Sequence, residues 1–459
     1  MEFKNKARIL VNSKTSIFRE LREDALEIFA AALDAVDPKK AIGSHIRMDR
    51  GAVRLGDLKL DLDVFSHIFV VGGGKAGGAM SEAVESVLGD RISGGVVNVL
   101  AGTEDLYNLK HISLNPASHP IPDDSGVRGV ERMLSIVNDA RPNDLLIVLI
   151  SGGGSALMTH PAEGVRLQDL QKVTDLLLRS GATINELNAV RKHLSDFKGG
   201  QLAKRAYPSR VLSLILSDVV GDPLDTIASG PTAPDETTFN DAVNILKSRR
   251  VWADTPEAVR HRLEKGVRGE IDETPKAGDE VFKNVTNVIV GSNLVAAKAA
   301  QRKALSKGYH TMILSTRVEG EARHIGTAMA GIAREIVATD NPLEKPAAII
   351  VGGETTVTVT GSGVGGRNQE IALSASLRIP GSGVLIASLA TDGIDGPTNA
   401  AGALVDGSTV DRSHEMELDP KSFLANNDSH SYFSRLGDLL ITGPTGTNVN
   451  DLTLILVSK

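Results

Sequence analysis

Short apolar runs that end directly in glycine-rich loops recur along this chain of 459 residues. Residues 64–71, 144–150 and 211–216 each have the length and composition of a buried strand. After the first two, a loop of glycines leads into a segment with helical character. Strand, loop and helix in this order form the repeating unit of open parallel sheets. The sequence therefore predicts an α/β fold.

Charge and composition narrow the classes of function. The chain has 50 Lys plus Arg against 57 Asp plus Glu, a formal charge of -7. Nucleic acid is therefore not expected as a partner, because phosphate backbones are bound through basic surfaces. The absence of cysteine excludes a disulfide framework, a cysteine-ligated zinc site and a cysteine nucleophile. No apolar run is long enough for a signal peptide or a membrane span, so we expect a cytoplasmic protein with no membrane partner.

The length exceeds what one ordinary core supports, so at least two domains are expected. We place an N-terminal α/β domain with glycine-rich phosphate loops at residues 1–235. A polar stretch, residues 236–286, is interpreted as a helical linker or flap. Strand patterns resume afterwards, and residues 287–459 are expected to form a C-terminal α/β domain.

The first glycine loop, residues 72–78 (GGGKAGG), contains one lysine. Its backbone N–H groups and the following helix N-terminus suit a phosphate, and Lys75 adds a positive charge. The loop also meets the dinucleotide pattern G-x-G-x-x-G. However, the next strand, residues 95–100, lacks the acidic residue that binds a ribose in dinucleotide sites. An ordinary tight turn with an exposed lysine is the alternative.

A second glycine loop, residues 151–155 (SGGGS), follows the next apolar strand. The serine-hydrolase pattern G-x-S-x-G fails because Leu157 occupies the last glycine position. Hydroxyl and N–H groups together suit a second anion-binding loop. A helix expected over residues 185–201 carries Arg191 and Lys198 toward its end, which indicates either a binding role or a solvated face.

A third glycine-rich stretch lies between two strand-like runs, residues 347–351 and 355–360, which predict a hairpin. The loop 361–366 follows, and Arg367 then opens a helix. A helix N-terminus with an arginine is an anion site, because the guanidinium matches phosphate or carboxylate geometry. The alternative is a glycine-rich turn with a solvated arginine.

Aspartates at strand ends are candidates for chemistry. Asp218 follows the strand 211–216, where open α/β sheets bind ligands, and could act as a general base or hold Mg²⁺. Asp392 and Asp395 follow another strand and suggest a hard-cation or sugar-hydroxyl site. Helix caps and aspartate-stabilised turns are the competing explanation. The histidines show no H-x-H or H-E-x-x-H spacing, so no transition-metal site is expected.

Seven sequence blocks, in order along nearly the whole chain, resemble the class II glycerate kinases with a C-terminal MOFRL domain. The blocks are GGGKAGGAM (72–80), SGGGSALM (151–158), NAVRKHLSDFKGGQLA (188–203), LSDVVGDPLDTIASGPT (216–232), GGETTVTVTGSGVGGRNQE (352–370), ATDGIDGPTNAAGALVD (390–406) and TGPTGTNVNDL (442–452). Asn399 departs from the aspartate expected of the family, which weakens a metal or hydroxyl role at that position.

The resemblance implies transfer of the γ-phosphoryl group of ATP to the 2-hydroxyl of D-glycerate with Mg²⁺, giving 2-phosphoglycerate. It implies two dissimilar α/β domains, the first Rossmann-like with a mostly parallel sheet, and an active site in the interdomain cleft. The MOFRL region would cover about residues 347–457. Lys75 and Arg367 would be the essential cations.

The expected site is then assembled from the blocks. Lys75, Arg367 and Asp218 are the catalytic candidates, and Asp218, Asp392 and Asp395 are the metal candidates. The expected substrate- and ATP-binding residues are Gly73, Gly74, Ser151, Gly152, Gly153, Gly154, Ser155, Arg191, Lys198, Ser217, Asp222, Ser229, Asn293, Glu354, Gly366, Asn368, Gln369, Thr445 and Asn448.

Two other functions compete with the kinase. A nicotinamide-dependent hydroxypyruvate reductase is supported by the G-x-G-x-x-G match and opposed by the missing acid and the lysine in the loop. A non-catalytic sugar-phosphate sensor would bind without turnover. The expected partners are small molecules, and the protein is expected to be a monomer or a homodimer.

Overall fold

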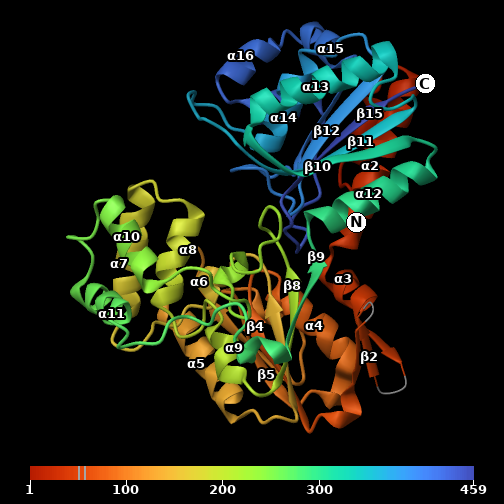
Figure 1. The fold of residues 1–459 in the computed structure, drawn as a ribbon. Helices are drawn as coiled ribbons and strands as arrows, with labels where there is room; N and C mark the ends of the chain where they lie inside the picture. Colours follow the sequence, from red (N-terminus) through yellow and green to blue (C-terminus); the bar gives the residue numbers. More distant parts are fainter. Residues whose placement is uncertain (50–51, 56–57) are drawn as a thin grey trace. The chain divides into compact units, whose positions relative to one another are not determined.

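The computed structural model describes residues 1–49, 52–55 and 58–459, which form two compact units (Figure 1). The glycine-loop unit is Pro38–Val290, and the terminal unit joins Met1–Asp37 to Gly291–Lys459. This division differs from the boundaries expected at residues 235 and 286. The N-terminal residues join the terminal unit because α2 (Ser16–Ala35) packs on α12 (Asn293–Ser306).

A buried charge also ties the N-terminal helices to the terminal unit. The guanidinium of Arg22, on α2, has no solvent exposure and pairs with Asp406 at 2.7 Å and Asp438 at 2.8 Å. Burial opposes the charge, but these two carboxylates raise the pKa of Arg22 above its ordinary value. A fully buried arginine is tolerated only with such partners, so the N-terminal segment is an integral part of this unit.

The glycine-loop unit contains a six-stranded sheet in the order β6-β5-β4-β7-β8-β9. The strands are β4 (His67–Gly73), β5 (Gly94–Leu100), β6 (Ile112–Ala117), β7 (Asp144–Ile150), β8 (Arg210–Leu216) and β9 (Val285–Gly291). The strands from β6 to β8 pair in parallel. In chain order this sheet reads 3-2-1-4-5-6, the Rossmann arrangement. The predicted Rossmann-like, mostly parallel sheet is confirmed.

The strand order indicates where a ligand would bind on this sheet. Successive strands run outward from β4 in one direction and from β7 in the other, and β4 and β7 pair directly. Every residue of β7 is buried, as expected of a strand covered on both faces. α4 (Gly77–Leu88) packs on β5 and β7, and α5 (Asp124–Asp139) packs on β5 and β6. Ligands of such sheets bind at the carboxyl ends of the two strands where the order reverses.

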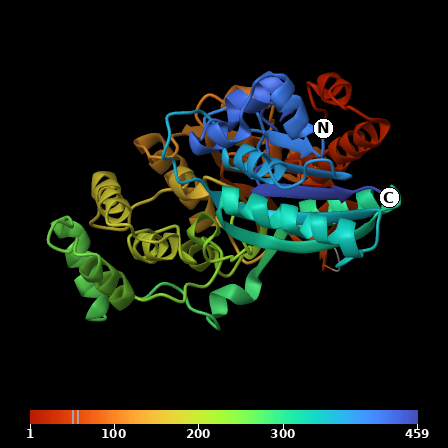
Figure 2. The ribbon, with the colours of Figure 1, turned by 90° about the horizontal axis from the view of Figure 1, so that it is seen from above.

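Four helices of the same unit form a separate core beside the sheet, in both views (Figures 1 and 2). They are α7 (Leu167–Arg179), α8 (Ile184–His193), α10 (Phe239–Ser248) and α11 (Glu257–Val267). Phe239 and Leu263, in the stretch expected to be a linker or flap, are buried against Leu177 and Val190. The stretch is helical, as expected, and its helices α10 and α11 supply two of the four helices of this core.

The helix expected over residues 185–201 also differs from the structure. α8 ends at His193, and a new helix, α9 (Gln201–Ala206), begins after Gly200. Gly199 and Gly200 have φ of 57° and 79°, which lie outside the right-handed helical region. The chain therefore turns here, directly after Lys198.

The terminal unit holds a sheet in the order β10-β11-β15-β12-β13-β14. Its strands are β10 (His310–Glu321), β11 (Ala347–Thr356), β12 (Val384–Ala390), β13 (Gly402–Asp406), β14 (Leu439–Leu440) and β15 (Asp451–Val457). β10 and β11 are parallel, and the other pairs are antiparallel. α13 (Ala322–Thr339) and α14 (Arg367–Ser376) pack on each other and share a core with this sheet.

The hairpin expected from residues 347–360 does not form. β11 continues through its two glycines to Thr356, because β10 and β15 pair with it on both sides. Gly353 pairs with Val318 on one side and with Asp451 on the other. Residues 357–366 contain no strand and lead to α14. A single strand therefore brings Glu354 beside the start of β15.

The remaining α-helices and strands are short. They are α1 (Lys6–Val11), α3 (Pro38–His45), α6 (Gly154–Leu157), α15 (Thr409–Glu415), α16 (Pro420–Ala425), α17 (Ser429–Leu436) and a three-stranded sheet of β1 (Arg47–Asp49), β2 (Ala52–Leu55) and β3 (Leu58–Asp61). No helix in the described part of the chain is long and apolar enough to cross a membrane.

Candidate active site

The two glycine loops of the glycine-loop unit form one continuous surface. The backbone N–H of Lys75 donates to the carbonyl of Gly152 at 2.8 Å, and that of Ala76 donates to Oγ of Ser151 at 3.1 Å. The N–H of Ser151 donates in return to the carbonyl of Gly73 at 3.3 Å. These bonds join the ends of β4 and β7, where the strand order reverses.

Glycine is required in both loops by close contact as well as by conformation. Gly74 has φ of 145°, and a Cβ there would lie 2.1 Å from Oγ of Ser151. Gly153 has φ of 79°, and a Cβ there would lie 3.1 Å from Cγ of Lys75 and 3.1 Å from Cδ2 of His119. Only glycine adopts these angles without strain. The second loop therefore provides the surface against which the Lys75 side chain lies.

Three groups of different chemistry surround this surface. The Lys75 side chain is exposed although its neighbours from residue 71 to residue 80 are buried. Burial, and next the charge of Lys75, lower the pKa of His119, so its imidazole is neutral at neutral pH. Asp218 lies against Gly152, where a Cβ would come 2.2 Å from its Oδ2. An ammonium, a neutral imidazole and a carboxylate thus lie around Gly152 and Gly153.

A hydroxyl pair adjoins the second loop. Oγ of Ser155 lies 2.8 Å from Oγ of Ser229, which donates to Oδ1 of Asn188 at 3.0 Å. Ala228 and Ser229 both have left-handed backbone angles, with φ of 50° and 61°. Such angles in non-glycine residues cost on the order of 1–3 kcal/mol each and cluster at functional sites. The strained turn after β8 therefore positions Ser229 at the loop.

Lys198 is hydrogen-bonded to the end of the second glycine loop. Its side chain is buried and its Nζ donates to the carbonyls of Ser155 at 2.7 Å and Met158 at 3.0 Å. Burial, with a smaller contribution from the charge of Arg191, lowers the pKa of Lys198 to about 7. Burial also lowers the pKa of Arg191. Both cations predicted on this segment therefore lie near the loop and are not a solvated face.

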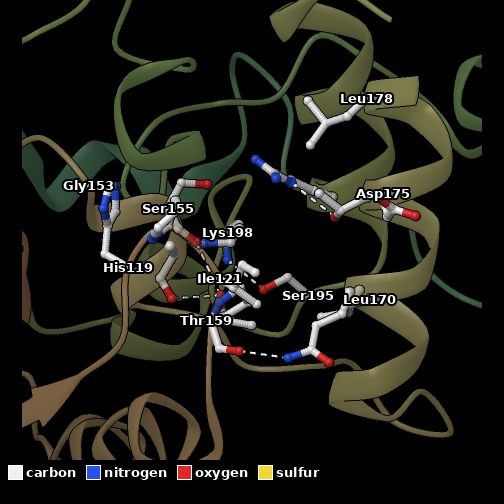
Figure 3. A pocket seen from close by; sticks show the side chains of 16 residues that line it. His119, Ile121, Gly153, Ser155, Thr159, Leu170, Asp175, Leu178, Ser195 and Lys198 are labelled. Carbon is white, nitrogen blue, oxygen red and sulfur yellow. Dashed lines mark hydrogen bonds between the residues drawn. The ribbon is translucent and has the colours of Figure 1, made fainter. Parts of the chain in front are cut away.

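A pocket of about 620 Å³ opens beside the loop (Figure 3). Figure 3 shows Gly153, Ser155 and His119 on one side and Leu170 and Leu178, on one helix, across from them. The walls come from the loops after β6 and β7 and from α7 and α8. The lining residues are His119, Pro120, Ile121, Pro122, Gly153, Ser155, Ala156, Thr159, Leu170, Gln171, Thr174, Asp175, Leu178, Arg191, Ser195 and Lys198.

The other predicted residues of this unit have local roles. Ser217 is buried at the end of β8, and its Oγ lies 3.4 Å from the backbone of Val219. Asp222 has φ of 58° and its N–H donates to the carbonyl of Val219 in a turn. Gly154 begins α6, and a Cβ there would lie 3.0 Å from Cβ of Ala228. These residues shape the loops around the site.

In the terminal unit, Arg367 is the first residue of α14 and lies between two carboxylates. Its Nη1 donates to Oε1 of Glu354 at 2.8 Å, and its Nε lies 2.6 Å from Oδ2 of Asp451. Burial opposes its charge, but Asp451 and then Glu354 raise the pKa of Arg367. Burial raises the pKa of Asp451 to about 7, against the opposing charge of Arg367. The guanidinium therefore has one buried partner, Asp451, and one solvent-exposed partner, Glu354.

Asp395 caps the helix that carries Arg367. Its carboxylate accepts the backbone N–H groups of Asn368 at 3.1 Å and Gln369 at 2.9 Å, and also their side-chain amides at 3.2 and 3.0 Å. Gly366 is needed for this approach, since a Cβ there would lie 2.2 Å from Cγ of Asp395. Asp395 thus caps α14, as the competing explanation expects, and a metal-binding role for it stays a prediction. Asn368 and Gln369 are fully buried and bonded within the protein.

The remaining predicted residues of the terminal unit hold its loops. Asn293 donates through Nδ2 to the carbonyls of Val449 at 2.9 Å and Asp451 at 2.8 Å. The other contacts are Oγ1 of Thr445 to the carbonyl of Thr391 at 2.6 Å, Oδ1 of Asn448 to the N–H of Asn450 at 3.0 Å, and Oδ1 of Asp392 to the N–H of Ile394 at 2.9 Å. Asn293 therefore fixes the strand start from which Asp451 reaches Arg367.

The residues present suit a magnesium ion that is shared with substrate. Among the residues that the structure describes, no group of three or more His, Asp or Glu side chains could hold a metal by itself. Mg²⁺ is usually held by one or two carboxylates together with substrate phosphates and water. Asp218, beside Gly152 of the second glycine loop, fits this arrangement.

Sequence reasoning missed two residues of these sites. His119 follows β6, and its place at the carboxyl end of a parallel strand was the available signal. Asp451 opens the last strand inside the block 442–452, but nothing in the sequence indicated its pairing with Arg367. The wall of the pocket on α7 had no sequence signal, because its residues are spaced like those of any amphipathic helix.

Comparisons with known proteins show which family the chain resembles over nearly its whole length. Residues 24–264 match a domain of unknown function (DUF4147), and residues 347–451 match the MOFRL family. A glycerate 2-kinase from Pyrococcus horikoshii is 43% identical over 96% of this chain and 99% of its own length. The crystal structure of a glycerate kinase from Thermotoga maritima is 41% identical with a TM-score of 0.86, over 95% of this chain and 99% of that one. A relative from Agrobacterium vitis, provisionally named a hydroxypyruvate reductase, is 40% identical over 95% of this chain and 94% of its own.

Proposed function

The chain belongs to the glycerate kinase family, and from this membership we propose that it transfers the γ-phosphoryl group of ATP to the 2-hydroxyl of D-glycerate. The products are 2-phosphoglycerate and ADP. The observation that carries the proposal is the junction of the two glycine loops at the crevice of a Rossmann-type sheet, with Lys75 at its surface. Backbone N–H groups and a positive charge at such a crevice suit phosphate groups.

In phosphoryl transfer, the protein contributes mainly positioning and charge neutralisation. The bond between the 2-hydroxyl oxygen and the γ-phosphorus forms while the bond from that phosphorus to the β–γ bridging oxygen breaks. Lys75 neutralises charge on the transferring group. Asp218 accepts the proton of the 2-hydroxyl or holds the metal ion, and these two roles differ in their dependence on pH. Asp218 would hold Mg²⁺ together with the phosphates of ATP, and the ion would supply positive charge against the charge that develops during transfer.

Arg367 is proposed to bind an anion of the reaction, either the carboxylate of glycerate or the transferring phosphoryl group. The pairing seen for Arg367 supports this role. Asp451 is buried and fixes the guanidinium through Nε and Nη2, whereas Glu354 is 44% exposed and contacts Nη1. A substrate anion can therefore replace Glu354 without disturbing the buried partner. The action of Lys75 and Arg367 in one site, in the cleft expected between the domains, stays a prediction.

Hydroxypyruvate reduction is the competing activity. The Rossmann strand order and the name of one relative favour it. Against it, β5 ends without an acid, and the amide of Asn98 donates to the carbonyls of Gly126 and Leu157. Asn98 therefore serves the packing of the unit and is not placed to bind a ribose.

One assay separates the two activities. The protein with ATP, Mg²⁺ and D-glycerate is expected to release ADP only when all three are present. With NADH and hydroxypyruvate it is expected to show no oxidation. Binding without turnover in both assays would favour a sensor. We further propose that the enzyme acts in the cytoplasm on small molecules as a monomer or homodimer.

A further inference from the structure

Two exposed apolar side chains lie on the pocket of Figure 3. Ile121, in the loop after β6, is 66% exposed, and Leu178, on α7, is 58% exposed. They come from segments that are far apart in the sequence, yet both line the same space. Large apolar side chains left in water at a concave site indicate a ligand with apolar surface.

D-Glycerate does not match this pocket. It is a three-carbon acid in which every carbon bears oxygen, so it has almost no apolar surface to cover Ile121 or Leu178. The pocket volume of about 620 Å³ is within the range of roughly 300–1,000 Å³ that is typical of sites for much larger ligands. A purine base has two apolar faces and a polar edge, and it would fill such a space.

The polar part of the pocket lies next to the phosphate loops. Gly153 lines the pocket, and a Cβ on it would contact the side chain of Lys75. Arg191 lines the same space, and among the described residues its hydrogen bond is a long one, from Nε to Oγ1 of Thr174 at 3.5 Å. An apolar end and a cationic end that adjoins the glycine loops match the two ends of a nucleoside triphosphate.

We propose that this pocket binds the adenine and ribose of ATP, with the base between Ile121 and Leu178 and the phosphates directed past Gly153 toward Lys75. The inference rests on the proposed kinase activity for the identity of the nucleotide. It assigns the nucleoside to the glycine-loop unit and leaves no role for this pocket in binding glycerate.

The test is calorimetric titration of the full chain with ADP, in the absence of glycerate, for Ile121→Ser, Leu178→Ser and the double variant. Each single change removes apolar contact area and should weaken ADP binding about tenfold. Inorganic triphosphate, which has no base, should bind the variants as it binds the unsubstituted protein. The KM for D-glycerate should not change.

Ile184→Ser is the matched control. Ile184 is 57% exposed on α8, in the same unit, and it does not line the pocket. Its substitution should leave ADP binding unchanged. Because all three positions are exposed, the melting temperatures of the variants should match that of the unsubstituted protein.

Three other outcomes would overturn the assignment. Unchanged ADP binding in the double variant would show that the base lies elsewhere. A rise in the KM for D-glycerate with unchanged ADP binding would indicate that the pocket binds glycerate. Equal weakening of ADP and triphosphate would mean that the substitutions act on the loop. If the unsubstituted protein binds ADP through these residues but does not phosphorylate glycerate, the pocket is confirmed and the kinase proposal fails.

Discussion

Arg367 is paired with Asp451, whose buried carboxylate lies 2.6 Å from Nε and accepts from Nη2 at 3.1 Å. Asp451 is the first residue of β15, and Arg367 is the first residue of α14. The direction of the guanidinium is thus set by the sheet and the helix together. An arginine fixed in this way loses little conformational freedom when it binds an anion.

Asp451→Asn should lower kcat by about 100-fold, because a misplacement of the guanidinium by about 1 Å has an effect of this size. Glu354→Gln is the comparison, since Glu354 is a partly exposed partner of the same group. A pair of that kind contributes at most about 1 kcal/mol, so its loss should change kcat less than tenfold. Steady-state kinetics of the two variants test the difference, and equal effects would contradict the unequal roles.

Lys75→Ala should lower kcat by at least about 10³-fold, the size seen for cations that act on a transferring phosphoryl group. ADP binding, measured by calorimetry, should change only a few-fold, since the backbone N–H groups of the loop remain. A variant that folds and keeps its kcat would remove Lys75 from the mechanism.

Gly153→Ala tests the close approach of the second loop to Lys75. The substitution should destabilise the fold by about 1–2 kcal/mol, because alanine is strained at φ of 79°. It should also lower kcat, because its Cβ meets Lys75 and His119. Gly164→Ala is the control, since Gly164 has φ of 82° and no neighbour within 4 Å of a Cβ. That control should show the stability loss alone, and a matching loss of kcat would refute the packing argument.

The lowered pKa of Lys198 predicts that the free energy of unfolding depends on pH. Its pKa is lowered from 10.5 to about 7 in the folded protein, mainly by burial. Between about pH 7 and pH 10.5 the unfolded chain holds a proton that the folded chain lacks, so the free energy of unfolding rises with pH in that window. Relative to Lys198→Met, the unsubstituted protein should gain up to about 1.4 kcal/mol per pH unit there. Urea unfolding of both proteins at several pH values measures this slope, and parallel curves would mean that Lys198 stays charged.

Asp395→Ala should lower the free energy of unfolding by about 2 kcal/mol, because two backbone N–H groups at the start of α14 lose their acceptor. Asp392→Ala removes an acceptor for the single N–H of Ile394 and should change it by less than about 1 kcal/mol. Chemical denaturation gives both values. A smaller effect at Asp395 than at Asp392 would contradict the capping role.

Much of the glycine-loop unit could be predicted from the sequence, because β4 and β7 are mostly apolar and run directly into glycine-rich loops. The runs before Gly72 and Ser151 predicted β4 and β7, and parallel strands of this kind join at one edge. The contact between the two loops follows from strand order, which no local pattern carries. The position of Lys75 in a glycine loop after a buried strand could therefore be predicted, whereas the packing of its side chain on Gly153 could not.

The errors have physical causes in long-range pairing. Gly352 and Gly353 suggested a break, but a strand between two partners continues through glycine when both neighbours supply hydrogen bonds. The polar composition after residue 235 predicted a linker or flap, yet Phe239 and Leu263 supply apolar contact for two amphipathic helices. The role of Asp395 as a cap could not be predicted, because the start of α14 is distant from it along the chain and close to it only in the fold.

The most direct test of the account is the phosphorus NMR spectrum of the product formed from ATP, Mg²⁺ and D-glycerate. Phosphorylation of the 2-hydroxyl places the phosphorus next to a carbon with a single hydrogen, so the account predicts a new doublet together with the signals of ADP. A triplet would indicate transfer to the 3-hydroxyl and would contradict the proposed regiochemistry. No new phosphate ester, from a folded protein that binds ADP, would contradict the kinase activity itself.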